Sequence, residues 1–387
     1  MKRVLSSRLV VGLVAAVVVL AFGASVATAT PAQQQREERR TFAAREGIEV
    51  DLENLAGQVT VEGTDGNDIE IVATIHAADG DRANAQTLLG LLDIEFDERG
   101  DRIRVRAHYP VERFDKYRYP QRGGGSYNTQ TTYENERVRV TSRDDDDAVT
   151  LYVDFVVRVP AGVAVDIENQ VGDVSASGMR GDFRADTGSG NVTVTGISGD
   201  VDADTGSGNV EVDGVTGEVR ADTGSGNVEI ANVTGDVSAD TGSGNITITD
   251  VQAGDINADT GSGNIRLQRV TGDINADTGS GNIIGRDIVS GAHISADTGS
   301  GDVRFEGDLS GVRQIEIDTS SGDVVLDMSA YPGMTITIET GSGSIDVDLP
   351  DLQTLRSRRS FFRGTVGDGS ADVVIDTGSG SVRIRGS

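Results

Sequence analysis

The sequence predicts an all-β protein whose body is a β-solenoid, preceded by a β-hairpin-rich N-terminal region with one short helix. Two observations carry this prediction. The tetrapeptide Thr-Gly-Ser-Gly, with one Thr-Ser-Ser-Gly variant, recurs ten times between residues 187 and 380, at spacings of 18 to 21 residues apart from one of 37. A short repeat of this kind is typical of solenoids. Inside each copy, β-branched residues alternate with polar ones, which indicates strands rather than helices.

Each copy of about 18 residues is expected to form one coil of two strands and two turns. The inward positions of one copy are Val201, Ala203, Val210, Val212 and Val215. Glycines allow tight turns at Thr-Gly-Ser-Gly. Burying the four large aliphatics yields roughly 6–12 kcal/mol, whereas ordering 18 backbone units costs roughly 18–36 kcal/mol, so a single coil cannot fold and the coils must stack.

Residues 1–29 have the layout of a secretory signal peptide. Lys2, Arg3 and Arg8 precede an uncharged apolar run over residues 9–24, and Ala27-Thr28-Ala29 offers the small residues at which signal peptidases cut. The alternative is an anchor that is retained, because the apolar run approaches the length that spans a bilayer. No later segment is apolar enough to cross a membrane. The protein is therefore expected to be exported: periplasmic, on the cell surface or secreted.

The region between the signal and the solenoid divides into three expected parts. Residues 30–46 are polar and unpatterned, which favours a flexible leader. Residues 47–160 form a β-rich region, with a hairpin turning at Asp65-Gly66, a short helix over residues 81–92 and a second hairpin after it. Within this region, residues 111–147 are expected to form a long polar loop.

Residues 161–349 form the predicted solenoid, in which one aspartate recurs in each coil. The column is Asp186, Asp204, Asp222, Asp240, Asp259, Asp277 and Asp297. Stacked coils would hold like charges about 4.8 Å apart, so something should compensate their repulsion. Either each carboxylate accepts hydrogen bonds from its own turn, as an Asx-turn, or the column binds Ca²⁺ between turns.

The repeat pattern is interrupted at two places. Gly285 stands where other copies carry an inward aliphatic residue, which predicts a bulge or a local kink. Residues 350–387 form an excursion that caps the solenoid, followed by a final coil. The excursion carries a basic and aromatic patch: Arg356, Arg358, Arg359, Phe361, Phe362 and Arg363. It either covers the exposed solenoid end or docks an acidic partner.

Composition excludes several functions. The chain has 387 residues and a net charge of −28, and residues 181–349 hold 29 acidic and 7 basic residues. This acidity argues against nucleic acid as a partner. With no Cys, the chain has no disulfide framework or thiol nucleophile. His76, His108 and His293 are dispersed and suggest no metal cluster, so no catalytic residue and no cofactor are expected apart from the Ca²⁺ alternative.

The order of these elements resembles the bacterial "putative adhesin" β-strand-repeat family, a domain of unknown function related to head GIN and toast-rack domains. The matching segments are LENLAGQVTVEG, VVRVPAGVAVDIENQVGDV, the ADTGSGNV copies and GDGSADVVIDTGSGSVRI. The resemblance spans about residues 46–387 and implies an exported, envelope-associated solenoid without catalytic residues.

Three hypotheses of function follow. The first is a noncatalytic, adhesin-like protein of the cell envelope or surface that presents an acidic β-solenoid to an envelope or surface ligand, whether protein, peptide or glycan. The second is an envelope-stress or sensory component that captures a cationic ligand. The third is a structural rod stabilised by calcium.

Overall fold

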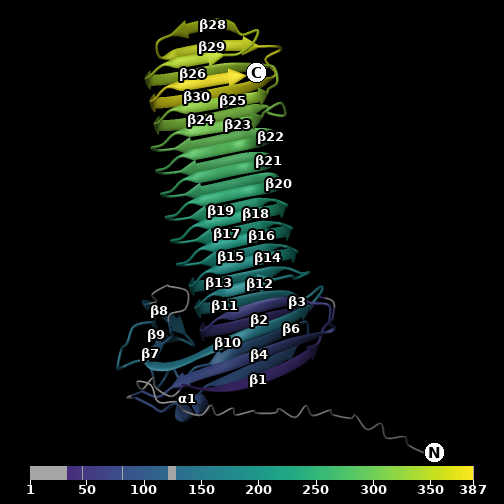
Figure 1. Cartoon of the computed structure of the whole chain (residues 1–387), viewed down its shortest axis with the longest axis vertical. Coiled ribbons are helices and arrows are strands. Elements are labelled where there is room, and N and C mark those ends of the chain that lie inside the picture. Colours follow the sequence, from purple (N-terminus) through teal and green to yellow (C-terminus); the bar gives the residue numbers. More distant parts are fainter. Residues whose placement is uncertain (1–32, 46, 81, 121–127, 387) are drawn as a thin grey trace, which may run out of the picture.

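Figure 1 shows a tall stack of strands on a broader N-terminal base in the computed structural model. The structure describes residues 33–386 except residues 46, 81 and 121–127, so the predicted signal peptide at residues 1–29 lies outside the described residues. Almost all neighbouring strands in the stack are parallel, as expected when successive coils repeat one strand order. The predicted all-β solenoid is confirmed.

The strands stack in two columns. The first column runs in spatial order β5 (Asp93–Arg99), β6 (Arg102–His108), β2 (Glu49–Ala56), β11 (Ala164–Val171), β13 (Phe183–Ser189), β15 (Val201–Thr205), β17 (Val219–Thr223), β19 (Val237–Thr241), the second halves of β20 (Ile246–Thr260), β21 (Ile265–Thr278) and β22 (Ile283–Thr298), β24 (Gln314–Ser321), β30 (Ala371–Ser379), β26 (Met334–Ser342), β29 (Phe361–Val366) and β28 (Gln353–Arg358).

The second column holds the other strand of each coil. It runs β1 (Gln33–Ala43), β4 (Asp68–Ala78), β10 (Val149–Pro160), β3 (Val59–Thr64), β12 (Val174–Ser177), β14 (Val192–Ser198), β16 (Val210–Thr216), β18 (Val228–Thr234), the first halves of β20–β22, β23 (Val303–Asp308), β25 (Val324–Ala330), β31 (Val382–Gly386) and β27 (Ile345–Asp348).

The core lies between the two columns and continues through the base. The five predicted inward positions of the 201–215 coil are each at most 2% exposed. A sixth inward position is the threonine of each Thr-Gly-Ser-Gly, and it was not expected. Thr205 is fully buried, and its hydroxyl donates a hydrogen bond to the carbonyl of Gly190 in the coil below, at 2.8 Å. This bond lets a polar side chain stay inside the stack.

The irregularity predicted at Gly285 is a bulge. The pairing of β22 with β23 shifts register between Gly285 and Ile288. A Cβ at Gly285 would lie 2.5 Å from the Phe305 ring of the next coil, so the missing side chain makes room for that ring. One large aromatic residue therefore fills space that two aliphatic residues fill elsewhere in the stack.

Three expectations about the N-terminal region are wrong. Residues 33–43 of the predicted flexible leader form β1, which pairs antiparallel with β4 over its whole length. The predicted loop 111–147 contains β7 (Lys116–Arg118), β8 (Asn128–Tyr133) and β9 (Glu136–Thr141), which form a small sheet on β10. The strands around Asp65-Gly66 do not pair with each other, because β10 lies between β3 and β4.

Two other expectations in this region are confirmed. The predicted short helix is α1 (Ala85–Leu91), with the Asn84 side chain accepting a hydrogen bond from the Thr87 backbone at its N-terminus. The second hairpin forms as β5 and β6.

The coil predicted after the excursion forms as β30 and β31, but it does not extend the stack. Strand β30 lies between β24 and β26, and β31 lies between β25 and β27. Strands β30 and β31 therefore lie between strands that precede them in the sequence. The excursion before β30 forms the β28–β29 hairpin, which adds to β26 in antiparallel fashion and ends the first column, at the end of the rod farthest from the base in Figure 1.

Candidate functional site: a carboxylate ladder along one face

Twelve carboxylates lie in register along the outward side of the first column. Residues that pair directly across neighbouring strands share one face. We call this row the carboxylate ladder: Glu53, Glu168, Asp186, Asp204, Asp222, Asp240, Asp259, Asp277, Asp297, Asp318, Asp376 and Glu339.

The ladder faces outward because strand side chains alternate. In the coils of the seven predicted aspartates the acidic residue stands between a buried alanine and the buried threonine, as Asp204 does between Ala203 and Thr205. All seven predicted aspartates belong to this row. Sequence reasoning missed its five other members. Asp318 and Asp376 precede a repeat tetrapeptide in the same way as the seven, so that signal was present in the sequence.

The electrostatics of the ladder are unfavourable to the charged state. Partial burial raises the pKa of Asp204, and the carboxylates of Asp186 and Asp222 on the neighbouring coils raise it further. The same two causes, in the same order, raise the pKa values of Asp240 and Asp277. The row therefore holds more negative charge than its surroundings compensate.

The Asx-turn explanation of the aspartate column is wrong. Among the described residues, no hydrogen bond reaches the carboxylates of the seven predicted aspartates. The turn is held by other groups. The Asn191 side-chain oxygen accepts a hydrogen bond at 2.9 Å from the Asn209 backbone of the next coil, and Asn209 does the same for Asn227. The asparagine after each tetrapeptide, not the aspartate before it, ties neighbouring coils together.

The geometry does not support the calcium alternative. The ladder supplies one carboxylate per coil, whereas Ca²⁺ takes six to eight oxygen ligands around one point. Within the part of the chain that the structure describes, no group of three or more His, Cys, Asp or Glu residues is arranged to hold a metal ion.

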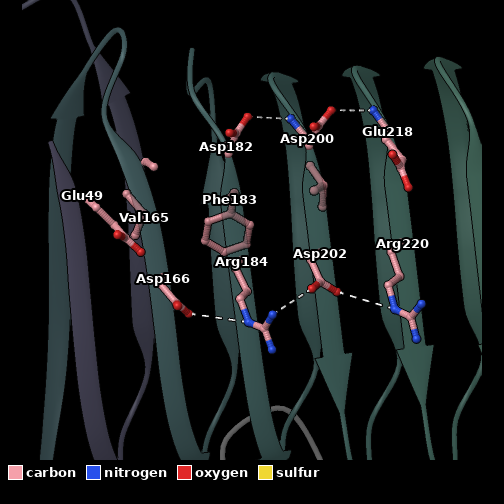
Figure 2. A pocket seen from close by; sticks show the side chains of 12 residues that line it. Glu49, Val165, Asp166, Asp182, Phe183, Arg184, Asp200, Asp202, Glu218 and Arg220 are labelled. Carbon is pink, nitrogen blue, oxygen red and sulfur yellow. Dashed lines mark hydrogen bonds and ion pairs between the residues drawn. The ribbon is translucent and has the colours of Figure 1, made fainter. Parts of the chain in front are cut away.

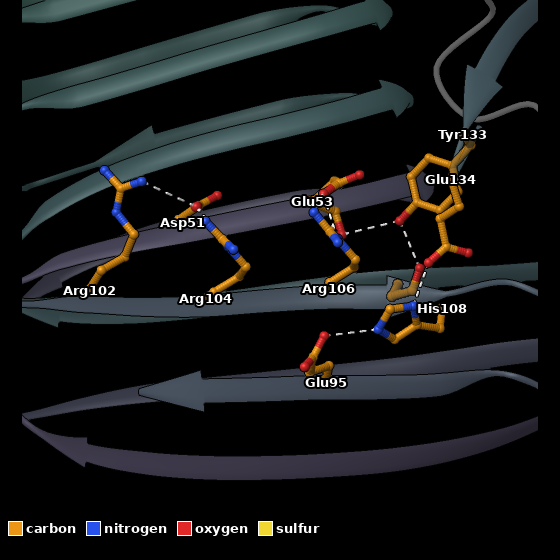
Figure 3. Close-up of polar contacts among 10 residues, drawn as sticks. Asp51, Glu53, Glu95, Arg102, Arg104, Arg106, His108, Tyr133 and Glu134 are labelled. Carbon is orange, nitrogen blue, oxygen red and sulfur yellow. Dashed lines mark hydrogen bonds and ion pairs between the residues drawn. The ribbon is translucent and has the colours of Figure 1, made fainter. Parts of the chain in front are cut away.

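At the end of the ladder next to the base, called its foot, the negative charge is compensated by arginines of β6. Arg106 of β6 forms an ion pair with Glu53, the first ladder residue, as Figure 3 shows. On the same two strands, Arg102 pairs with Glu49 at 2.7 Å. Because β6 ends the parallel stack here, its arginines neutralise the lowest carboxylates only.

A histidine joins this foot to the small sheet of the base. His108 of β6 lies between Glu95 of β5 and Glu134 of the β8–β9 turn (Figure 3). Burial disfavours the charged imidazole, but its hydrogen bonds to the two carboxylates outweigh burial and raise the pKa of His108. The other two described histidines also contact carboxylates: His76 lies 3.2 Å from Asp154, and His293 lies 3.1 Å from Asp273.

Near the base, the acidic charges in the row next to the ladder are compensated by arginines of the same row, and Arg220 of that row also lies 3.6 Å from Asp222 of the ladder. Figure 2 shows Asp166, Arg184, Asp202 and Arg220 alternating in sign along successive coils. Arg184 lies 3.8 Å from Asp166 and 3.1 Å from Asp202. This row lines a shallow groove of about 440 Å³ near the base. Two adjacent rows of one face therefore differ: one alternates in charge from Asp166 to Arg220 and is uncharged over the next four coils, and the other is acidic throughout.

The predicted basic and aromatic patch lies on the β28–β29 hairpin. Arg356 and Arg358 are exposed on β28, Arg359 is exposed in the turn, and Arg363 is exposed on β29. Phe361 is half-buried on the outward side, with the Arg356 guanidinium 5.1 Å from its ring centre. Phe362 instead points inward and is 7% exposed. The structure brings these residues together at one end of the rod, next to the last ladder residue.

A parallel two-column stack with repeating rows of outward charges defines a β-solenoid of the toast-rack class. The chain belongs to the Toastrack DUF4097 family, which it matches over residues 94–250 and 217–385. This match confirms the resemblance noted from the sequence. No curated protein matches the chain.

Three solved structures align with the chain at low similarity. A putative cell adhesion protein from Clostridium sporogenes is 8% identical, with a TM-score of 0.17, 91% of this chain and all of that chain covered. A putative adhesin from Parabacteroides merdae is 11% identical, with a TM-score of 0.23 and coverages of 76% and 95%. A putative adhesin from Bacteroides fragilis is also 11% identical, with a TM-score of 0.23 and coverages of 90% and 96%. The family assignment rests on the sequence match.

The one described helix is far shorter than a membrane span, and no helix within the described residues is long and apolar enough to cross a bilayer.

Proposed function

We propose that this protein is an exported, noncatalytic surface-interaction protein, and that the carboxylate ladder is its contact face for a cationic ligand. One observation carries the proposal: from Asp240 to Glu339, seven successive ladder residues have no ion pair to a basic side chain in the described part of the chain. A row of uncompensated charges about 4.8 Å apart attracts a linear partner of opposite charge.

A noncatalytic role agrees with the surroundings of the histidines. Each of the three contacts a carboxylate, and within the described residues none has a hydrogen bond to a serine or threonine hydroxyl, as a general base would. Export agrees with the apolar run and the cleavage pattern at residues 9–29.

The contact face is tested with an oligolysine peptide as the probe. Neutralising two adjacent residues of this stretch, Asp240→Asn with Asp259→Asn, should weaken binding about tenfold at low salt and reduce its salt dependence. The matched control is Glu211→Gln with Glu229→Gln, which removes two adjacent, exposed carboxylates from the opposite column. Equal losses in both double variants would show that only net charge matters and would remove the ladder from the proposal.

Surface display is tested separately by protease treatment of intact cells. Release of solenoid fragments is expected for a surface-interaction protein. Fragments that appear only after the envelope is opened would instead favour the sensory alternative, in which the same acidic face captures a soluble cationic ligand inside the envelope.

A further inference from the structure

The outward side of the β28–β29 hairpin gathers three arginines and one aromatic ring. In the antiparallel pairing, Arg356 is directly opposite Arg363, and Arg358 is directly opposite Phe361. Directly opposite residues share a face, so these four side chains form one surface, which we call the hairpin face. All three arginines on it are exposed.

The hairpin face is unfavourable for the isolated chain. Like charges directly opposite each other destabilise a strand pair, and Arg356 and Arg363 form such a pair. Within the described residues, none of its three arginines has a carboxylate within ion-pair distance, whereas Arg106, Arg184 and Arg269 elsewhere do. A contribution to the stability of the isolated chain therefore does not explain why three arginines lie together on the hairpin face.

Protection of the free edge does not account for it either. Charged side chains on an outermost strand keep other strands from adding to it, and β28 is the outermost strand here. Arg363, however, lies on β29, which is paired on both sides, with β26 and with β28. A charge there protects no edge.

The matching acidic surface lies just below, on the same side of the rod. Phe361 is directly opposite Glu339, so the ladder continues through Phe361 to Arg358. Two strand spacings, about 10 Å, separate Arg358 from Glu339. Each molecule thus carries a basic surface and an acidic surface side by side, and within the described residues no ion pair joins them.

We propose that the hairpin face of one molecule docks on the upper ladder of a second copy, at Glu339, Asp376 and Asp318, in a two-fold contact between rod ends. Because both surfaces lie on one side of the rod, a two-fold axis through that side sets each hairpin on the partner's ladder at once. A longer overlap would bring ladder against ladder, so charge repulsion confines the contact to the ends.

Self-association is measured by sedimentation equilibrium on the chain from residue 30 onward, which contains every described strand. At about 50 mM salt the weight-average mass should rise with concentration toward twice that of the monomer, and at about 500 mM salt it should return to the monomer value. The variant Arg356→Glu with Arg363→Glu should stay monomeric in both. The control is Arg266→Glu with Arg286→Glu, which changes the net charge equally at exposed sites on the body of the rod and should dimerise like the parent.

A charge exchange identifies the partner surface. The variant Glu339→Arg with Asp376→Arg should also be monomeric, because its ladder end repels the hairpin face. Mixed with Arg356→Glu/Arg363→Glu, it should form a heterodimer, since every contact then joins opposite charges. Circular dichroism checks that both variants are folded. A parent chain that remains monomeric at low salt, or mixed variants that fail to associate, would overturn the proposal, and the first result would leave another acidic molecule as the occupant.

Discussion

At the scale of single residues, the repeat is constrained by contact between coils. The second glycine of each tetrapeptide lies against the coil below, and a Cβ added at Gly226 would lie 1.8 Å from the carbonyl oxygen of Gly208. Strand spacing in a parallel stack cannot widen at one point without breaking ladder hydrogen bonds on both sides. Close approach of backbones is therefore the main reason for glycine here, rather than the turn conformation expected from the sequence.

The substitution Gly226→Ala should destabilise the protein by about 3 kcal/mol, at the upper end of what overpacking costs. Denaturant unfolding followed by circular dichroism measures the change. The matched control is Gly214→Asn. Gly214 has a φ of +73°, no atom lies closer than 3.6 Å to its added Cβ, and the next coil already places Asn232 there at a φ of +55°. This control should cost about 1 kcal/mol or less, and equal costs would contradict the contact explanation.

At the scale of an element, the carboxylate ladder forms a uniformly acidic surface, and the repulsion between its carboxylates lowers the stability of the folded chain. The pKa values of Asp204 and Asp240 are raised in the folded chain by burial and by their neighbours. A carboxyl group with a raised folded-state pKa binds its proton more tightly when folded than when unfolded. Its unfavourable effect is therefore present at neutral pH and is relieved as the pH falls through the folded-state pKa.

The parent chain should accordingly unfold at a higher temperature at about pH 5 than at about pH 7.5 in low salt. The protonation of His108, whose folded-state pKa is also raised, acts in the same direction. The variant Asp204→Asn with Asp240→Asn isolates the ladder: its unfolding temperature should vary less with pH, and high salt should narrow the difference between variant and parent. An unchanged pH dependence in the variant would mean that the ladder repulsion does not affect stability.

At the scale of the whole molecule, the order of strands differs from the order of the chain. The last coil is inserted between two earlier ones, because β30 pairs with both β24 and β26. It contributes four aliphatic residues to the core, Val373, Ile375, Val382 and Ile384, each at most 1% exposed. At about 1.5–3 kcal/mol each, their burial is comparable to the net stability of a typical domain.

A chain that ends at Ser370 should therefore lose cooperative thermal unfolding, because β24 and β26 lose the strand between them. Replacing residues 353–366, the hairpin, with a Gly-Ser linker of equal length should be milder, since only one edge of the stack is changed. Scanning calorimetry of both variants gives the comparison. Equal losses, or a milder effect of the truncation, would contradict the inserted position of β30 and β31.

The sequence predicts which residues face the core, but it does not predict the hydrogen bonds that join neighbouring coils. The period of the tetrapeptide and the alternation around Val210 and Val212 fix which residues face inward, and burial confirms them. The same alternation places the aspartates outward. It does not predict which groups hold the turns, because an Asx-turn at Asp204 and an asparagine ladder at Asn209 use the same residue types and differ only in hydrogen bonds between coils.

By itself, the sequence determined the coil, its two faces and the acidic row, because these follow from local periodicity and from the sign of each side chain. Only the tertiary structure decided which strands are neighbours: β10 between β3 and β4, and β30 between β24 and β26. The physical reason is that all coils carry the same inward pattern, so many stacking orders satisfy it locally. Contacts between residues far apart in the chain select one order, and that order places the arginines of the hairpin face beside the acidic ladder.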